Sequence, residues 1–219
     1  MKQLWNGIRL AAVAVTAIGA ATSTAGAQIH FMGNTFGCFY TGGATPTDCT
    51  GLLASTGNLT YDGSTFDVVS NPVDGLVAIG GAPGTPNVNN LGSFTLIDGN
   101  HDYTGQKFAL FVNFTHPTGV MGDNLYTATV TGNLSTATTG NVFIDFVNTS
   151  HNFTFGDGTT LSFEVNDVSL DDHDTGNATI SVSGHGFAHA GTVPEPSSMA
   201  LLGTGLIGLV PLIRRRRNS

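Results

Sequence analysis

Alternation of apolar and polar side chains constrains the fold of this chain more than any other feature of its sequence. In residues 161–166, Leu, Phe and Val occupy every second position and polar side chains fill the others. The same period of two occurs in residues 126–131 and 179–183. Because successive side chains of a strand point to opposite faces of a sheet, this period indicates half-buried β-strands and not amphipathic helices.

Turn signals divide the middle of the chain into many short strands. Asp62-Gly63 and Asp98-Gly99 supply residues that accept positive φ between two strands. Residues 108–115 carry apolar side chains on both faces, which is typical of a central strand. The expected strands are residues 58–61, 65–69, 75–79, 92–97, 108–115, 126–131, 142–147, 153–155, 161–166 and 179–183. This pattern predicts one all-β domain over residues 28–191, a single antiparallel β-sandwich or jelly roll.

Charge in this middle part is almost entirely negative. Residues 28–192 hold fourteen acidic residues against one basic residue, Lys107, which gives a formal charge of −13. A domain with a single cation cannot neutralise a phosphate backbone, so we expect no nucleic-acid partner. The same surface repels anions and attracts divalent cations.

The first 27 residues have the three parts of a secretory signal. Residues 1–9 contain Lys2 and Arg9 and no acidic residue, and residues 10–20 form an uncharged apolar run. Ala25 and Ala27 then give the small-x-small form that signal peptidase accepts, so cleavage is expected before Gln28. Residues 1–27 are therefore predicted to be a signal peptide that exports the domain.

Export changes the interpretation of the two cysteines. Cys38 and Cys49 lie eleven positions apart in a stretch rich in Gly, Thr and Pro. In an oxidising compartment, two cysteines around such a loop pair as a disulfide. A metal site would need more ligands nearby than Asp48, and a reactive thiol would need an activating base.

Two clusters resemble metal sites in part. Asp171, Asp172 and Asp174 form the densest group of oxygen ligands, which suits calcium, although the spacing departs from the EF-hand loop. A solvated acidic turn is the other interpretation, and we expect no cofactor unless calcium binds here. His185 and His189 would share one face of a strand, but no third zinc or copper ligand follows at matching spacing.

Catalysis has little support in the sequence. Nucleophile elbows, zinc-protease motifs and phosphate loops are all absent from it. Asp145, Glu164 and Asp167 are the carboxylates that would have to meet in space in a glycosidase. We therefore expect no enzyme and no catalytic residues.

The end of the sequence has three parts. Val193, Pro194, Glu195 and Pro196 cannot continue a helix or a strand, because the two prolines lack the backbone donor. Residues 199–213 carry no formal charge and would span about 23 Å as a helix, a marginal transmembrane anchor. The cluster that follows would stop transfer and stay in the cytoplasm. Its members are Arg214, Arg215, Arg216 and Arg217.

Pro-Glu-Pro, a short apolar helix and a terminal arginine cluster together resemble the PEP-CTERM sorting signal of Gram-negative bacteria. The resemblance covers residues 192–219 and implies that an exosortase, a membrane cysteine protease, recognises Pro194, Glu195 and Pro196. It further implies transient anchoring in the cytoplasmic membrane with the domain outside, and then delivery to the cell surface or extracellular matrix. Residues 91–96, 108–115 and 161–168 also resemble, more weakly, β-sandwich domains of the choice-of-anchor type.

Three functions fit these observations. The first is a non-enzymatic structural or adhesive component of an exopolysaccharide or biofilm matrix. The second is a lectin-like module that binds extracellular polysaccharide, with calcium at the Asp171 cluster as an option. The third is a hydrolase that acts on the matrix polymer.

Overall fold

The computed structural model describes residues 28–191 apart from 85, 98, 135–139 and 172–176. Among these residues, no helix has the length and apolar character needed to cross a membrane. The described residues form fifteen strands. They are β1 (His30–Thr41), β2 (Ser55–Thr56), β3 (Leu59–Asp62), β4 (Thr65–Val69), β5 (Leu76–Ile79), β6 (Ser93–Ile97), β7 (His101–Asp102), β8 (Gln106–His116), β9 (Leu125–Leu134), β10 (Asn141–Phe146), β11 (His151–Thr154), β12 (Thr160–Val165), β13 (Val168–Asp171), β14 (Asn177–Ser181) and β15 (Gly184–His189).

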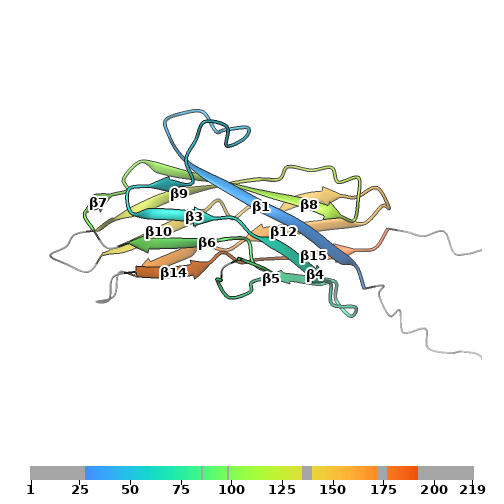
Figure 1. The fold of residues 1–219 in the computed structure, drawn as a ribbon. Helices are drawn as coiled ribbons and strands as arrows, with labels where there is room; N and C mark the ends of the chain where they lie inside the picture. The colour runs from blue at the N-terminus through green and yellow to red at the C-terminus, as the bar shows by residue number, and fades with distance from the viewer. Residues whose placement is uncertain (1–27, 85, 98, 135–139, 172–176, 192–219) are drawn as a thin grey trace, which may run out of the picture.

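One layer of the structure is a seven-stranded antiparallel sheet of described residues, in the order β13-β10-β9-β8-β1-β4, with β7 added beside β9 (Figure 1). β1 and β8 are neighbours within it, and their register places Phe36 opposite Phe111 and Asn34 opposite Asn113. Both strands carry apolar side chains on both faces, as expected for residues 108–115. This register decides which side chains share the outer face of the sheet.

The second layer consists of two four-stranded antiparallel sheets, β11-β12-β15-β5 and β14-β6-β3-β2. The chain passes from one to the other between β14 and β15, where Val182 exchanges backbone hydrogen bonds with Leu91 and Gly92. β12 and β13 are also consecutive in sequence but belong to different layers. The connection from β12 to β13 therefore joins the two layers. The predicted all-β sandwich is confirmed.

Aromatic side chains fill the core between the layers. The ring of Phe108 on β8 lies 4.9 Å from the rings of both Tyr61 on β3 and Phe94 on β6, measured between ring centroids. Further along β8, Phe114 lies 4.9 Å from Phe153 and 6.0 Å from Phe163, on the other sheet of the second layer. A single strand therefore contacts both sheets opposite it, and these large apolar surfaces supply most of the burial that stabilises the fold.

Two strands of four or more residues, β1 and β13, have no counterpart among the expected ones. β15 was anticipated only as a strand that would align His185 with His189. β1 begins at His30, spans twelve residues and includes Cys38, which the sequence suggested to lie beside a flexible loop. Its inner face carries Gly33, Thr35 and Gly37 between Phe31 and Phe39, so the apolar pattern is interrupted. The loop after Cys38 is therefore shorter than predicted and begins only after Thr41.

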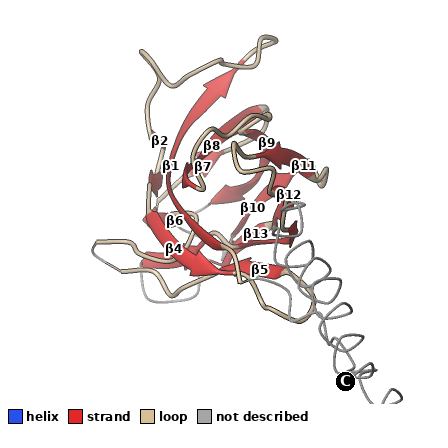
Figure 2. Cartoon of the chain, turned by 90° about the vertical axis from the view of Figure 1, so that its right-hand side faces the viewer, coloured by secondary structure: helices blue, strands red, loops and turns tan. Residues whose placement is uncertain are grey.

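Both ends of the described chain lie at one end of the sandwich (Figure 1). The carbonyl of Ile29 accepts a hydrogen bond from Ser70, and the amide of Ala188 donates to the carbonyl of Gly75. A shallow pocket of about 300 Å³ contains Ile29 and Ala190 together. The loop that follows β1 projects from the body of the sandwich beyond the far end of that strand, as Figures 1 and 2 both show.

Candidate functional site

The residues predicted to direct export and sorting lie outside the described part of the chain, with one exception. Gln28, the residue after the predicted cleavage site, is described and exposed. Gly191, the last residue described, lies beside Asp157 and Gly158. The domain therefore presents its two junctions, toward residues 1–27 and toward residues 192–219, at the same end. The predicted sorting and export residues outside the described part are Ala25, Ala27, Val193, Pro194, Glu195, Pro196 and Arg214 to Arg217.

Cys38 and Cys49 form a disulfide at the end of the sandwich where β1 ends, as predicted. Cys38 is buried on the outer face of the seven-stranded sheet, in a small apolar cluster with Tyr40, Ala109 and Phe111. The disulfide thus ties the projecting loop to the outer face of the sheet near the end of β1. Constraining that loop reduces the entropy of the unfolded chain, which stabilises the fold.

A polar pocket of about 530 Å³ opens beside the outer face of the same sheet. Side chains of Asn34 on β1, Asp62 at the end of β3 and Thr65 on β4 line it. The segment containing Asn87 closes its far wall. Asn87 is buried and fully engaged: its Nδ2 donates to Ser93 Oγ at 2.8 Å and its Oδ1 accepts from the amide of Gly84 at 3.0 Å. The Asn87 side chain is therefore held in place by hydrogen bonds within the domain.

Buried hydroxyl groups support the floor of this polar pocket. The hydroxyl of Tyr61 donates to the carbonyl of Leu91 at 2.6 Å and lies 3.1 Å from Thr35 Oγ1. Thr35 Oγ1 in turn accepts from the amide of Ser64 at 3.0 Å. Burial raises the pKa of Tyr61 well above its usual value of 10.0, the bond to Thr35 lowers it in part, and the nearby Asp62 carboxylate raises it further. The tyrosine is therefore a neutral, fixed hydrogen-bond donor beneath the pocket.

A row of three asparagines runs across the sheet to the polar pocket. Asn124 Nδ2 donates to Asn113 Oδ1 at 2.6 Å, and Asn113 Nδ2 donates to Asn34 Oδ1 at 3.4 Å. Each amide therefore points its acceptor away from the pocket and its donor toward it. Within the part of the chain that the structure describes, Asn34 Nδ2 at the end of the row has no hydrogen-bond partner.

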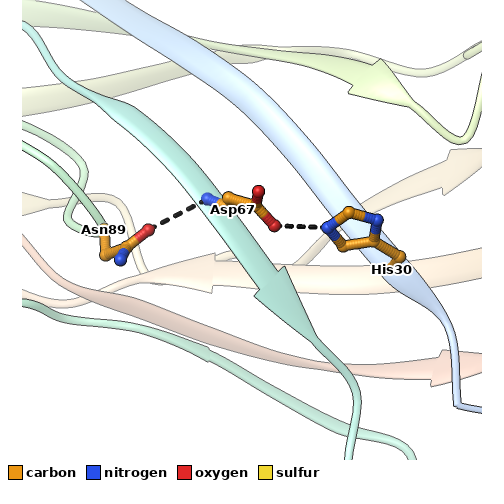
Figure 3. Close-up of polar contacts among 3 residues, drawn as sticks. All are labelled: His30, Asp67 and Asn89. Carbon is orange, nitrogen blue, oxygen red and sulfur yellow. Dashed lines mark hydrogen bonds and ion pairs between the residues drawn. The ribbon is translucent and has the colours of Figure 1, made fainter.

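Figure 3 shows the edge of this sheet, where His30, Asp67 and Asn89 meet. Asn89 Oδ1 accepts a hydrogen bond from the backbone amide of Asp67 at 3.0 Å. The backbone amide of Asn89 donates a hydrogen bond to the carbonyl of Thr65. The carboxylate of Asp67 also contacts His30 Nε2. Asn89 has a φ of 56°, a conformation that asparagine tolerates better than most residues. These contacts occupy backbone groups of β4 that would otherwise be an open sheet edge.

The two groups considered for metals are only partly described. Asp171 is exposed at the end of β13, whereas Asp172 and Asp174 lie outside the described residues. His185 and His189 share the exposed face of β15, as predicted, and His185 Nδ1 lies 3.1 Å from Asn166 Oδ1. Over the described residues, no three His, Cys, Asp or Glu side chains are grouped closely enough to hold a metal ion.

Two of the carboxylates considered for a hydrolase, Asp145 and Glu164, lie on different layers. Asp145 is exposed on β10 in the seven-stranded sheet, and Glu164 is half-buried on β12 in the other layer. Each alternates with buried neighbours, so each points away from the shared core. Asp167 Oδ1 accepts a hydrogen bond from the amide of Phe146 at 2.8 Å, which gives this carboxylate a structural partner.

The asparagine row and Phe36 were not singled out by the sequence. Phe36 stacks on Phe111 with ring centroids 4.8 Å apart and planes 8° apart, next to Asn34 on the same face. These residues come from positions up to 90 residues apart, and only the register of β1 against β8 brings them together. A signal was present in the repeated outward-facing Asn residues, but it could be interpreted only once β1 had been recognised as a strand.

Comparison with known proteins identifies one segment of the chain. No curated protein and no solved structure matches the chain. Residues 192–217 match the family model of the PEP-CTERM protein-sorting motif, and this range includes both the Pro-Glu-Pro segment and the four arginines. The chain therefore carries a PEP-CTERM protein-sorting motif directly after its β-sandwich domain.

Proposed function

We propose that this protein is a non-enzymatic structural or adhesive component of an extracellular polysaccharide matrix, at the surface of a Gram-negative bacterium. The observation that carries the proposal is the sorting motif at residues 192–217, joined to a β-sandwich. The motif supports a protein that is exported, anchored in the membrane for a time and processed by an exosortase. Signal peptidase would act first, before Gln28.

The sandwich has properties that suit a passive component outside the cell. Its disulfide closes the projecting loop at one end, and both chain junctions lie at the other. Asn89 covers the edge at β4, which reduces unwanted pairing between copies. The separation of Asp145 from Glu164 favours this role over a hydrolase that acts on the matrix polymer.

Fractionation of the matrix tests this proposal. Cells producing the protein with its natural signals are separated into cytoplasm, membranes, washed cell surface and extracellular polymer. We expect the protein in the surface and polymer fractions, and we expect the purified protein to release no new reducing ends from that polymer. Confinement to the membrane fraction would contradict the matrix role, and released reducing ends would support the hydrolase.

The second candidate function is a carbohydrate-binding module, which the polar pocket beside Asn34 favours. It does not require metal. Its calcium-assisted form, with Asp171, Asp172 and Asp174 as ligands, is tested by melting the protein in calcium and then in EDTA. An unchanged melting temperature would leave the metal-free form.

A further inference from the structure

We propose that the polar pocket, together with the exposed ring of Phe36 beside it, binds an uncharged polysaccharide. This inference deepens the proposed function and rests on it, because it names the polymer class that the protein would meet in the matrix. Four features of the described residues carry the inference: a free donor, a nearby acceptor, a flat apolar ring and the absence of cations.

The asparagine row provides the donor. Asn124 and Asn113 donate in sequence toward Asn34, so Asn34 Nδ2 is directed and unpaired among the described residues at the rim of the pocket. The exposed carboxylate of Asp62 and the hydroxyl of Thr65 line the same pocket. A sugar carries neighbouring hydroxyl groups, each both donor and acceptor, and therefore fits a site that offers an amide donor next to a carboxylate acceptor.

Phe36 provides the apolar surface. Its side chain is 39% exposed, although it stacks on the buried ring of Phe111. Phe36 and Asn34 are two residues apart on β1, so both point from the same face of the sheet. A pyranose ring has C–H groups on its faces and hydroxyls at its rim. Stacking one face on Phe36 would thus leave the hydroxyls free to reach Asn34 and the pocket.

The charge of the domain determines which polysaccharide fits. Lys107 is the only Lys or Arg in residues 28–191. It lies six positions from Asn113 along β8, about 20 Å away at the usual rise of a strand. Its ammonium group contacts the carbonyl of Gly42 and lies over the ring of Tyr40. A uronic acid or sulfated polymer would meet Asp62 with no compensating cation, whereas an uncharged polymer would meet no repulsion.

The pocket is also fixed before any ligand arrives. Asn87, Thr35 and Ser64 are buried, and each is held by hydrogen bonds within the domain. The pocket volume of about 530 Å³ lies within the usual range for ligand sites, roughly 300–1,000 Å³. A preformed site loses less conformational entropy on binding, so a few hydrogen bonds and one stacked ring are enough for measurable affinity.

Affinity electrophoresis with the cells' own polymer tests the inference. The extracellular polysaccharide is separated by anion exchange into uncharged and acidic pools, and each pool is cast into a native gel. Protein recovered from the cell surface should be retarded by the uncharged pool and not by the acidic pool. Retardation should persist at high salt, because no ion pair contributes. Preference for the acidic pool, or no retardation in either, would overturn the inference.

Substitutions locate the surface. Phe36→Ala should weaken binding at least roughly fivefold and Asn34→Ala roughly three- to tenfold, whereas Phe36→Tyr keeps the ring and should bind as well as the parent. Phe187→Ala is the matched control, since Phe187 is 49% exposed on the other layer, and its binding should not change. Thermal melting of each variant shows that it is folded.

These results separate the inference from the matrix role. If Phe36→Ala and Asn34→Ala bind like the parent, the surface is wrongly assigned even though the protein resides in the matrix. If the protein binds the uncharged pool but is absent from the matrix fraction, the pocket is supported and the matrix role fails. Binding to a matrix protein instead of polysaccharide, detected as retardation that protease treatment of the pool abolishes, would also overturn the inference.

Discussion

Gly37 on β1 packs directly against the ring of Phe108 on β8. A Cβ atom at Gly37 would overlap the end of that ring and approach the carbonyl of Ala109. Gly33, four residues earlier, has the same relationship with the ring of Phe66. On the inner face of β1, aromatic rings from neighbouring strands therefore fill space that side chains of β1 leave open.

Gly37→Ala should destabilise the fold. The added methyl group must displace a buried ring or the backbone of β8, and overpacking of this kind costs about 1–3 kcal/mol. Urea unfolding of the purified protein measures the change. Gly43→Ala is the control, because open space surrounds Gly43, and its effect should stay within about 0.5 kcal/mol. Equal stability of the two variants would show that the Phe108 ring moves aside without cost.

This packing also explains which strands the sequence predicted. Strands with Leu, Val, Ile or Phe at every inward position, such as β8, β10 and β12, were expected and are present. β1 was missed because glycine occupies two of its inward positions, and the apolar side chains there come from neighbouring strands. β15 has glycine at two inward positions as well, and only its alternating histidines pointed to a strand. In β15 a Cβ atom at Gly184 would lie 2.7 Å from the ring of Phe163 on β12, and one at Gly186 would overlap the carbonyl oxygen of Ser162.

The sorting segment and the polar pocket differ in predictability for a similar reason. The sorting segment lies within one short stretch of sequence, so Pro194, Glu195, Pro196 and the arginine cluster can be recognised without a structure. The family model matches the same residues. The polar pocket assembles Asn34, Asp62 and Asn87 from separate turns and strands. Its geometry depends on the register of β1, a strand that local periodicity did not predict.

Alkaline pH should unfold the domain through two buried tyrosines. Tyr126 donates its hydroxyl to the carbonyl of Phe163 at 3.0 Å across the core. Burial raises the pKa of Tyr126, with smaller contributions from Asp123 and Glu164, and burial raises the pKa of Tyr61 as well. Both residues ionise near pH 10 once unfolded, so the folded state keeps protons that the unfolded state loses.

The resulting stability is complete below about pH 10 and falls as the pH rises above it. Each tyrosine should reduce the free energy of unfolding by about 1.4 kcal/mol per pH unit there. Urea midpoints measured from pH 8 to pH 11.5 check this. Tyr126→Phe should lower the slope above pH 10 by about 1.4 kcal/mol per pH unit, while lowering stability at pH 8 by about 1–3 kcal/mol because the Phe163 carbonyl loses this hydrogen bond. A midpoint independent of pH would contradict the assignment.

Asn89 should stabilise the β4 edge in two separable ways. Asn89→Gly keeps the positive φ but removes the acceptor of the Asp67 amide, so we expect a loss of about 1 kcal/mol. Asn89→Ala removes the acceptor and also forces a residue with a Cβ into that conformation, which should cost about 1–2 kcal/mol more. Urea unfolding of both variants measures the difference. Equal stability of the two would mean that the backbone relaxes to a negative φ.

The tail gives the sharpest test of sorting. If an exosortase processes the motif, the protein at the cell surface lacks the segment beyond Pro196, including Arg214 to Arg217. Intact mass of surface-extracted protein measures this. Replacing Pro194 and Pro196 with alanine should prevent recognition and leave the arginines attached in the membrane fraction, whereas Ser198→Ala, beyond the Pro-Glu-Pro segment, should be processed normally. Parent protein that retains its arginines at the surface would instead indicate a permanent anchor, because the cluster then keeps its position on the cytoplasmic side.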